Sequence, residues 1–182
     1  MLASLVVRGL GDDAALLPLA AAVAVCEACE RCAPVRCEIK WPNDVWIDER
    51  KVAGILLEGR PAEGWAVIGI GINVTVRARD LPDELRETAT SLAQAGGGSP
   101  GVEPVLATLI AALERWLSVG AGEVVAAWSA RDALRGRPIR WDGGEGVAEG
   151  IDASGALVVA AGDRRVSLHA GEVSVVRPAR TG

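Results

Sequence analysis

The pattern of apolar segments and turns changes near residue 136, and this change divides the 182-residue chain into two parts. After Gly136-Arg137-Pro138, short apolar segments are separated by Asp-Gly, Ser-Gly and Gly-Asp pairs, which favour tight turns between antiparallel strands. This pattern predicts a small antiparallel barrel in residues 136–182, after a first domain of residues 1–135. The expected strands of the barrel are residues 139–141, 146–148, 156–159, 165–168 and 173–176.

Residues 1–135 contain longer segments and form a domain of ordinary size. Apolar runs predict strands here, and segments with high helix propensity or apolar residues at helical spacing predict helices. The first part therefore combines a sheet with helices, and the barrel that follows is of SH3-like size. Strands are expected at residues 2–8, 35–40, 45–48, 51–58 and 65–71, the last continuing through residue 73 toward 76, and helices at 14–31, 102–119 and 123–134.

The composition excludes several classes of protein. Half of the residues are hydrophobic and the formal net charge is −5, with arginines scattered along the chain. This charge distribution argues against nucleic-acid binding. The Ala-rich run at residues 14–28 is too short to span a bilayer, and the first residues lack the basic region and cleavage site of a signal peptide. We therefore expect a cytoplasmic protein that binds neither nucleic acid nor membrane.

Lysine is nearly absent from this chain. Of its 19 lysine and arginine residues, only Lys40 and Lys51 are lysines, and both lie in one twelve-residue window. A compact ammonium differs from the planar guanidinium that the chain uses elsewhere, so the window is a candidate site. Pro42 ends strand pairing after Trp41, which places Lys40 at the end of a strand. The alternative is a structural strand–turn–strand with a solvated lysine.

A second candidate is the segment Gly-Ile-Gly-Ile-Asn at residues 69–73. It is not a dinucleotide-binding fingerprint, because the third glycine is missing and the following residues predict a strand. Glycine inside a strand often marks the close approach of a ligand or of another backbone. The Asn73 side chain offers both a donor and an acceptor, which suits a purine edge or a metal-bound water. A bulge or tight packing of the sheet remains the alternative.

The cysteines and the single histidine are assigned structural roles. Cys26, Cys29, Cys32 and Cys37 are spaced similarly to an iron–sulfur motif, but three of them fall in an Ala-rich helical pattern without the glycines of a cluster loop. Small buried cysteines on a core helix are the favoured interpretation, so no metal ligand is assigned. His169 lies far from the other candidates in sequence and has no second histidine to work with.

Three motifs together resemble biotin protein ligases in order and spacing: Lys-Trp-Pro-Asn-Asp-Val at residues 40–45, Arg-Lys-Val-Ala-Gly-Ile-Leu-x-Glu at 50–58, and the segment at 69–73. The resemblance implies an α+β fold with a mixed sheet flanked by helices, as in class II synthetases, followed by the SH3-like domain. It also implies formation of biotinyl-5′-AMP from biotin and MgATP, and transfer of the biotinyl group to a lysine of a carboxyl-carrier protein.

The resemblance further assigns roles to single residues. Lys40 would stabilise the negative charge where the biotin carboxylate meets the α-phosphate. The strand from Lys51 would line the biotin pocket, where Gly54 would let the ligand lie close to the backbone, and Asn73 would lie near the nucleotide or magnesium. The full expected site is Lys40, Asn43, Asp44, Lys51, Gly54, Ile55, Gly71, Ile72 and Asn73.

The family also carries a Gly/Arg-rich loop upstream of the strand expected at residues 2–8, and this sequence does not contain it. We expect that the chain starts inside the sheet because of a truncated start; a fragment or a loss of ligase activity are the alternatives.

Other expectations are a carboxylase carrier domain as partner and a homodimer. The competing hypotheses for function are a non-catalytic relative that binds biotin or a carrier domain, and a lipoate-type ligase.

Overall fold

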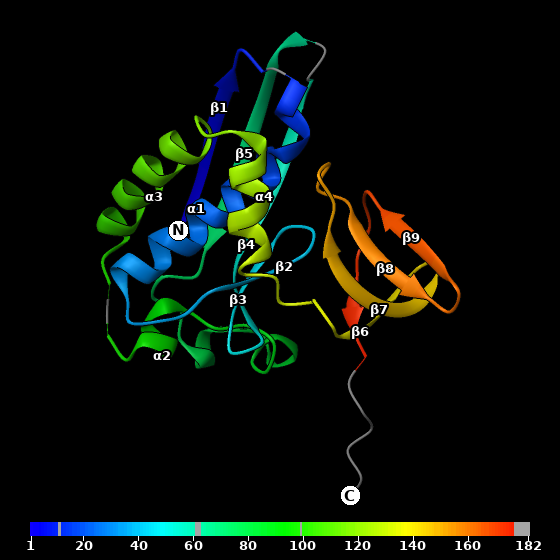
Figure 1. Ribbon diagram of the computed structural model, residues 1–182. Helices are drawn as coiled ribbons and strands as arrows, with labels where there is room; N and C mark the ends of the chain where they lie inside the picture. The colour runs from blue at the N-terminus through cyan, green and yellow to red at the C-terminus, as the bar shows by residue number, and fades with distance from the viewer. Residues whose placement is uncertain (11, 61–62, 99, 177–182) are drawn as a thin grey trace, which may run out of the picture.

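The computed structural model describes the chain except residues 11, 61–62, 99 and 177–182 (Figure 1). The architecture is α+β, as expected, and its strands form two five-stranded sheets. The first sheet contains β1 (Leu2–Arg8), β2 (Glu38–Lys40), β3 (Asp44–Ile47), β4 (Arg50–Arg60) and β5 (Trp65–Ile72). The second contains β6 (Pro138–Trp141), β7 (Gly144–Ile151), β8 (Leu157–Ala161), β9 (Arg164–Leu168) and β10 (Ser174–Val175).

The first sheet has the strand order β1-β5-β4-β3-β2, and each neighbouring pair is antiparallel. The expectation of a mixed sheet is therefore wrong for the strands described. Short turns join β2 to β3 and β3 to β4, and such turns reverse the chain direction each time. Parallel pairing with this sheet occurs, among the described residues, in two isolated bridges: Ile39 with Asp132 and Lys51 with Ala89.

Helix α1 (Leu17–Cys32) is the centre of the first domain. It lies against the strands β2–β4 on one side and against α3 (Val102–Trp116) and α4 (Ala121–Ser129) on the other (Figure 1). Its residues 19–26 are buried all round, which its small side chains allow. The helix begins later than expected, since a 3-10 turn (Asp12–Leu16) precedes it and Pro18 suits its first turn. The remaining helix, α2 (Leu92–Gly96), is short.

The strands of the first sheet bury only the face that α1 covers. In β5, buried residues alternate with partly exposed ones, so that Ile68, Ile70 and Ile72 point toward the helices. On the opposite face, Leu2 is 91% exposed and Val6 is 61% exposed. The second face of the sheet is thus available for a binding site.

The second sheet has the order β10-β6-β7-β8-β9, with antiparallel pairing throughout the described strands. It corresponds to the expected small domain of SH3-like type, and its strands lie within a few residues of the predicted ones. Pro138 is the first residue of β6. We propose that the domain boundary lies where the sequence pattern changes, at residues 135–138.

The segment that joins α4 to β6 pairs with the first sheet, so α4 ends earlier than the sequence pattern predicts. Within this segment one carboxylate oxygen of Asp132 accepts a hydrogen bond from the Leu134 N–H at 2.8 Å. Its other oxygen is buried and has no hydrogen-bond partner among the residues that the structure describes. Burial raises the pKa of the Asp132 carboxyl above its ordinary value, although the Leu134 and Arg135 N–H groups oppose this.

This raised pKa predicts a pH-dependent term in stability. The folded state retains the Asp132 proton to higher pH than the unfolded chain does, so stability is lost as pH rises from the ordinary Asp pKa through the raised one. The free energy of unfolding of Asp132→Asn should therefore fall less than that of the native chain between about pH 3.5 and about pH 7, a range that includes the ordinary Asp pKa. Urea unfolding at both pH values measures the difference. Asp142→Asn, at an exposed position, is the control; equal pH dependence in all three proteins would contradict the prediction.

Candidate active site

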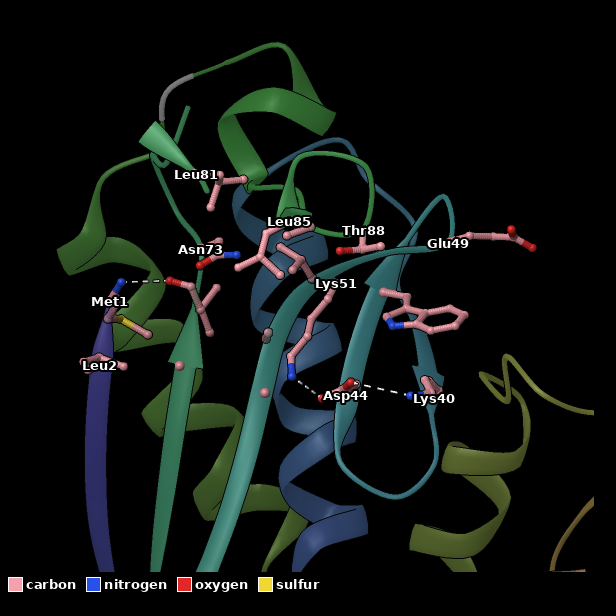
Figure 2. A pocket seen from close by; sticks show the side chains of 17 residues that line it. Met1, Leu2, Lys40, Asp44, Glu49, Lys51, Asn73, Leu81, Leu85 and Thr88 are labelled. Atoms are coloured by element: carbon pink, nitrogen blue, oxygen red, sulfur yellow. Dashed lines mark hydrogen bonds and ion pairs between the residues drawn. The ribbon is translucent and has the colours of Figure 1, made fainter. Parts of the chain in front are cut away.

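One residue from each strand of the first sheet lies in a single row across it. The strand register places Leu2 opposite Gly71, Gly71 opposite Gly54, Gly54 opposite Asp44, and Asp44 opposite Lys40. Directly opposed residues of antiparallel strands project to the same face. The row therefore brings all three sequence motifs together on the face away from α1 (Figure 2).

This row forms part of the wall of a cavity of about 720 Å³. Five of the expected site residues besides the two glycines of the row line it: Lys40, Asp44, Lys51, Ile72 and Asn73. The wall is completed by residues at the ends of the strands and by the segment after β5. These are Met1, Trp46, Glu49, Val52, Ala53, Leu81, Leu85, Thr88 and Ala89 (Figure 2).

A β-bulge brings Lys51 to the site. The pairing between β3 and β4 shifts so that Ala53 opposes Val45 while Lys51 opposes Trp46, which leaves Val52 as the extra residue. Val52 and Ala53 are both buried, whereas regular alternation would have buried only one of them. As a result Lys51 shares a face with Trp46 and with the row. A bulge near a site commonly re-aims a side chain in this way.

The two lysines flank one carboxylate (Figure 2). The Lys51 Nζ lies 2.6 Å from Asp44 Oδ1, and the Lys40 Nζ lies 3.9 Å from Asp44 Oδ2. Lys40 also lies over the Trp46 ring, with 5.7 Å between Nζ and the ring centroid. The Lys40 side chain is 18% exposed and that of Lys51 is 48% exposed. Two positive charges against one negative charge leave this end of the cavity suited to an anion.

The glycines of the row create space for particular neighbours. A Cβ atom on Gly54 would lie 3.1 Å from the Lys51 Cε and 3.2 Å from its Nζ, so the lysine side chain passes directly over this glycine to reach Asp44. A Cβ atom on Gly71 would lie 3.3 Å from Leu2 Cδ2. Because neither position carries a side chain, a ligand in the cavity could approach the backbone of the sheet closely.

Asn43 and Ile55 do not line the cavity; they hold its framework. The Asn43 side-chain amide donates to the Ile55 carbonyl at 2.8 Å, and the Ile55 N–H donates to the Asn43 carbonyl at 2.9 Å. This reciprocal pair ties the β2–β3 turn to β4. Asn73 does reach the wall, and its amide donates to the Thr90 carbonyl at 3.0 Å. One of the two N–H donors of its side-chain amide is therefore used by the protein backbone.

Sequence reasoning missed the contribution of residues 81–89. Backbone hydrogen bonds on either side of Lys51 hold this segment: the Lys51 N–H donates to Thr88, and the Thr90 N–H donates to Lys51. Leu81 and Leu85 then form an apolar part of the wall. Two leucines four residues apart in a polar segment were the available signal, but only the contact with β4 directs them to the cavity.

The residues assigned structural roles lie away from this cavity. Cys26, Cys29 and Cys37 are buried, and burial raises the pKa of the Cys26 thiol well above its ordinary value, which keeps it neutral in the core. Cys32 is partly exposed. His169 is exposed just after β9. Within the described ranges, no group of three or more His, Cys, Asp or Glu residues could hold a metal ion. No described helix is long and apolar enough to cross a membrane.

Two family models match the chain. Residues 2–74 match the biotin/lipoate A/B protein ligase family, and residues 136–176 match the biotin protein ligase C-terminal domain. The first match contains all three motifs of the candidate site. The second covers the strands of the small sheet.

Curated relatives give the same result. The chain is 49% identical over 84 residues to the bifunctional ligase/repressor BirA of Bacillus subtilis, over 44% of this chain and 26% of that protein. It is 36% identical over 136 residues to the biotin–[acetyl-CoA-carboxylase] ligase of Paracoccus denitrificans, over 69% of this chain and 57% of that protein. The aligned regions thus span from about a quarter to somewhat over half of these relatives.

A solved structure, the biotin protein ligase from Aquifex aeolicus in complex with biotin and ATP, has the same fold. It is 25% identical, with a TM-score of 0.84, and the match covers 97% of this chain and 78% of that one. The apo structure of the biotin protein ligase from Aquifex aeolicus gives a TM-score of 0.86 at 24% identity, over 96% of this chain and 82% of that one. Both comparisons include the small C-terminal sheet within the region covered.

The path of Lys51 over Gly54 can be tested directly. Gly54→Ala should push the Lys51 ammonium away from Asp44, because the new methyl group would meet the end of that side chain. An ammonium moved away from Asp44 is no longer covered by that carboxylate, so Lys51 should react faster than in the native chain with an acylating reagent, as peptide mass spectrometry would show. Gly69→Ala is the matched control, since its Cβ would make ordinary contacts of 3.6 Å or more. Equal Lys51 reactivity in both variants would contradict the assigned path.

Proposed function

This chain belongs to the biotin protein ligase family, and we propose on that basis that it takes part in ATP-dependent biotinylation of a carboxyl-carrier domain. In the first step the biotin carboxylate would attack the α-phosphate of ATP, forming biotinyl-5′-AMP and releasing pyrophosphate. In the second, a carrier lysine would attack the acyl carbon and displace AMP. The observation that supports this most directly is the pair of lysines around Asp44 at one end of the cavity.

The first step brings two anions together. A carboxylate and a phosphate approach each other, and negative charge grows on the phosphate oxygens in the transition state. Lys40 is the proposed charge-stabilising group, because its side chain is only 18% exposed and its charge is therefore weakly screened by solvent. Lys51 is more exposed and pairs closely with Asp44. In this proposal it contributes a second positive charge at the cavity mouth.

The shape of the cavity supports binding of both substrates. A volume of about 720 Å³ lies within the range of about 300–1,000 Å³ that is usual for small-molecule sites. We propose that biotin lies over Gly54 and Gly71, where the backbone is open, and that the purine lies near Asn73 and the apolar wall from Leu81 and Leu85. Because the Asn73 side-chain amide nitrogen already donates to the Thr90 carbonyl, we propose that the amide oxygen accepts a hydrogen bond from the nucleotide.

Magnesium is proposed to enter as part of MgATP. The carboxylates that line the cavity are Asp44 and Glu49, and both are already in ion pairs, Asp44 with the two lysines and Glu49 with Arg137. The described residues therefore do not fit a metal site held by the protein alone. Magnesium bound mainly by phosphates and water agrees with its usual preference.

The acyl transfer step requires no nucleophile from this chain. The carrier lysine supplies the attacking amine, and the cavity needs only to hold the adenylate and admit that side chain. The match of residues 136–176 to a biotin ligase C-terminal domain favours biotin over lipoate as the acyl group. We also propose the outer edge of β1 as the surface through which a homodimer would form, since β1 ends the sheet.

Biotin-dependent exchange of radioactive pyrophosphate into ATP tests the first step. We expect exchange with biotin and none with lipoate or without an acid, because only the biotin carboxylate would be aligned with the α-phosphate. Isothermal titration with biotin completes the test. Biotin binding without exchange would support the non-catalytic alternative, and exchange with lipoate would support a lipoate-type ligase.

Lys40 variants test the charge-stabilising role. Lys40→Ala should lower the exchange rate by about 10²-fold with a smaller effect on biotin affinity, because the ammonium acts most strongly in the transition state. Lys40→Arg should also be slow, since a planar guanidinium does not replace a point charge in a confined site.

Lys51→Ala measures how much the second ammonium contributes to the exchange rate. Arg36→Ala, at an exposed position of the chain, is the control for the loss of one positive charge. Equal losses of rate and affinity in Lys40→Ala would show that Lys40 binds the ground state only. A larger rate loss in Lys51→Ala would transfer the main role to Lys51.

A further inference from the structure

Both chain neighbours of Lys40 are held by residues from the second half of the chain. The Ile39 N–H donates to the Arg131 carbonyl at 2.7 Å, and the Ala133 N–H donates to the Ile39 carbonyl at 2.9 Å. On the other side of Lys40, the indole N–H of Trp41 donates to the Gly155 carbonyl at 3.0 Å. Ile39 and Trp41 are both buried. The position of Lys40 therefore depends on contacts far from it in sequence.

Gly155 lies in the turn between β7 and β8, and this turn is tightly built. The Asp152 N–H donates to the Ala156 carbonyl, while one Asp152 carboxylate oxygen accepts from the Ser154 N–H at 2.8 Å, the Ser154 hydroxyl at 2.6 Å and the Ala156 N–H at 3.1 Å. These bonds, with those from Ser154 as the largest contribution, lower the pKa of the Asp152 carboxyl. They fix the direction of the Gly155 carbonyl.

The same turn is seated against the beginning of α1. Gly155 has a φ of +85°, and a Cβ atom there would lie 2.9 Å from Leu19 Cδ1 and 3.4 Å from Leu16 Cδ2. The backbone conformation favours glycine here, and a Cβ atom would also meet the ends of the Leu19 and Leu16 side chains. The turn of the small domain therefore fits closely between Trp41 and these two leucines.

We propose that the β7–β8 turn, residues 152–156, is a positioning element of the site: through the Trp41 indole it fixes where the Lys40 ammonium stands relative to Asp44. In this view the small domain completes the first domain, because its turn holds one neighbour of Lys40 while the segment before β6 holds the other. The catalytic meaning of this contact rests on the proposed function, in which misplacement by about 1 Å can cost on the order of 10²-fold in rate. The contact between the turn and Trp41 does not depend on the proposed function, because it is a hydrogen bond of the structure itself.

A matched pair of glycine variants tests the proposal. Gly155→Ala introduces a methyl group against Leu19 and displaces the turn, whereas Gly162→Ala, in the β8–β9 turn of the same sheet, places alanine at a similar φ of +61° with nothing within 4 Å. Both variants share the cost of alanine in left-handed backbone. The difference between them isolates the contact with the first domain.

The first measurement does not need enzymatic activity. The chain has two lysines, so acylation with an N-hydroxysuccinimide ester followed by peptide mass spectrometry gives the reactivity of Lys40 relative to Lys51. We expect Gly155→Ala to raise this ratio severalfold and Gly162→Ala to leave it unchanged, because a released Trp41 would expose its neighbour. An unchanged ratio in folded Gly155→Ala would overturn the proposal.

The second measurement is biotin-dependent pyrophosphate exchange. Gly155→Ala should lower the exchange rate by about tenfold more than Gly162→Ala, with a smaller change in biotin affinity, as expected for a displaced charge-stabilising group. A shifted lysine ratio without exchange in any form of the protein would support the positioning role while refuting the proposed function. Normal exchange in Gly155→Ala would refute the positioning role alone.

A second pair of variants covers the case in which Gly155→Ala fails to fold. Asp152→Ala removes the acceptor that organises the turn without adding a methyl group against α1, and Asp163→Ala is its control in the β8–β9 turn. We expect the lysine ratio to rise in Asp152→Ala alone, with both proteins folded by circular dichroism. An identical ratio in the two variants would overturn the proposal.

Discussion

The register of the first sheet is the constraint on which the candidate site depends. Because five antiparallel strands are aligned so that Leu2, Gly71, Gly54, Asp44 and Lys40 lie in one row, residues from three separate motifs share one face and one cavity. A slip of one residue between any two strands would move a motif to the face covered by α1. The buried isoleucines of β5 oppose such a slip, because it would expose them to solvent. Hydrophobic burial on one face therefore determines the chemistry available on the other.

The charges of the site follow from the same arrangement. Without Asp44, the two lysine ammoniums would repel each other. The carboxylate of Asp44 pairs with both and keeps them near the cavity. Glycine at the centre of the row contributes in a different way, because the Lys51 side chain crosses the space above Gly54. Thus the glycine serves the protein's own lysine as well as the proposed ligand. The two domains are linked by comparable means, since a glycine turn of the small sheet fits against α1 and Trp41.

Much of this arrangement could be predicted from the sequence. The apolar runs and turn residues predicted the strands of both sheets within a few residues, and proline after Trp41 predicted a strand ending at Lys40. Errors arose where long-range contacts override local pattern. Helix α4 ends at Ser129 because the following residues pair with Ile39. The first sheet is antiparallel because short turns connect β2 to β3 and β3 to β4, and because β1 pairs with β5 in the opposite direction although the two are far apart in the chain. The bond between Asn43 and Ile55, both expected in the site, and the wall formed by Leu81 and Leu85 could not be read from the local pattern.

By itself, the sequence determined the family, the α+β class and the order of the motifs, since these depend on local pattern and on residue types at short spacing. Only the tertiary structure decided which side chains meet. The bulge at Val52 turns Lys51 to the side of Asp44, although strict alternation would direct it toward the helices. Likewise, Trp41 and Gly155 are 114 residues apart in the chain, and only the packing of the two domains brings them within hydrogen-bond distance. Strand register and domain packing are settled by the burial of whole faces, which no short segment contains.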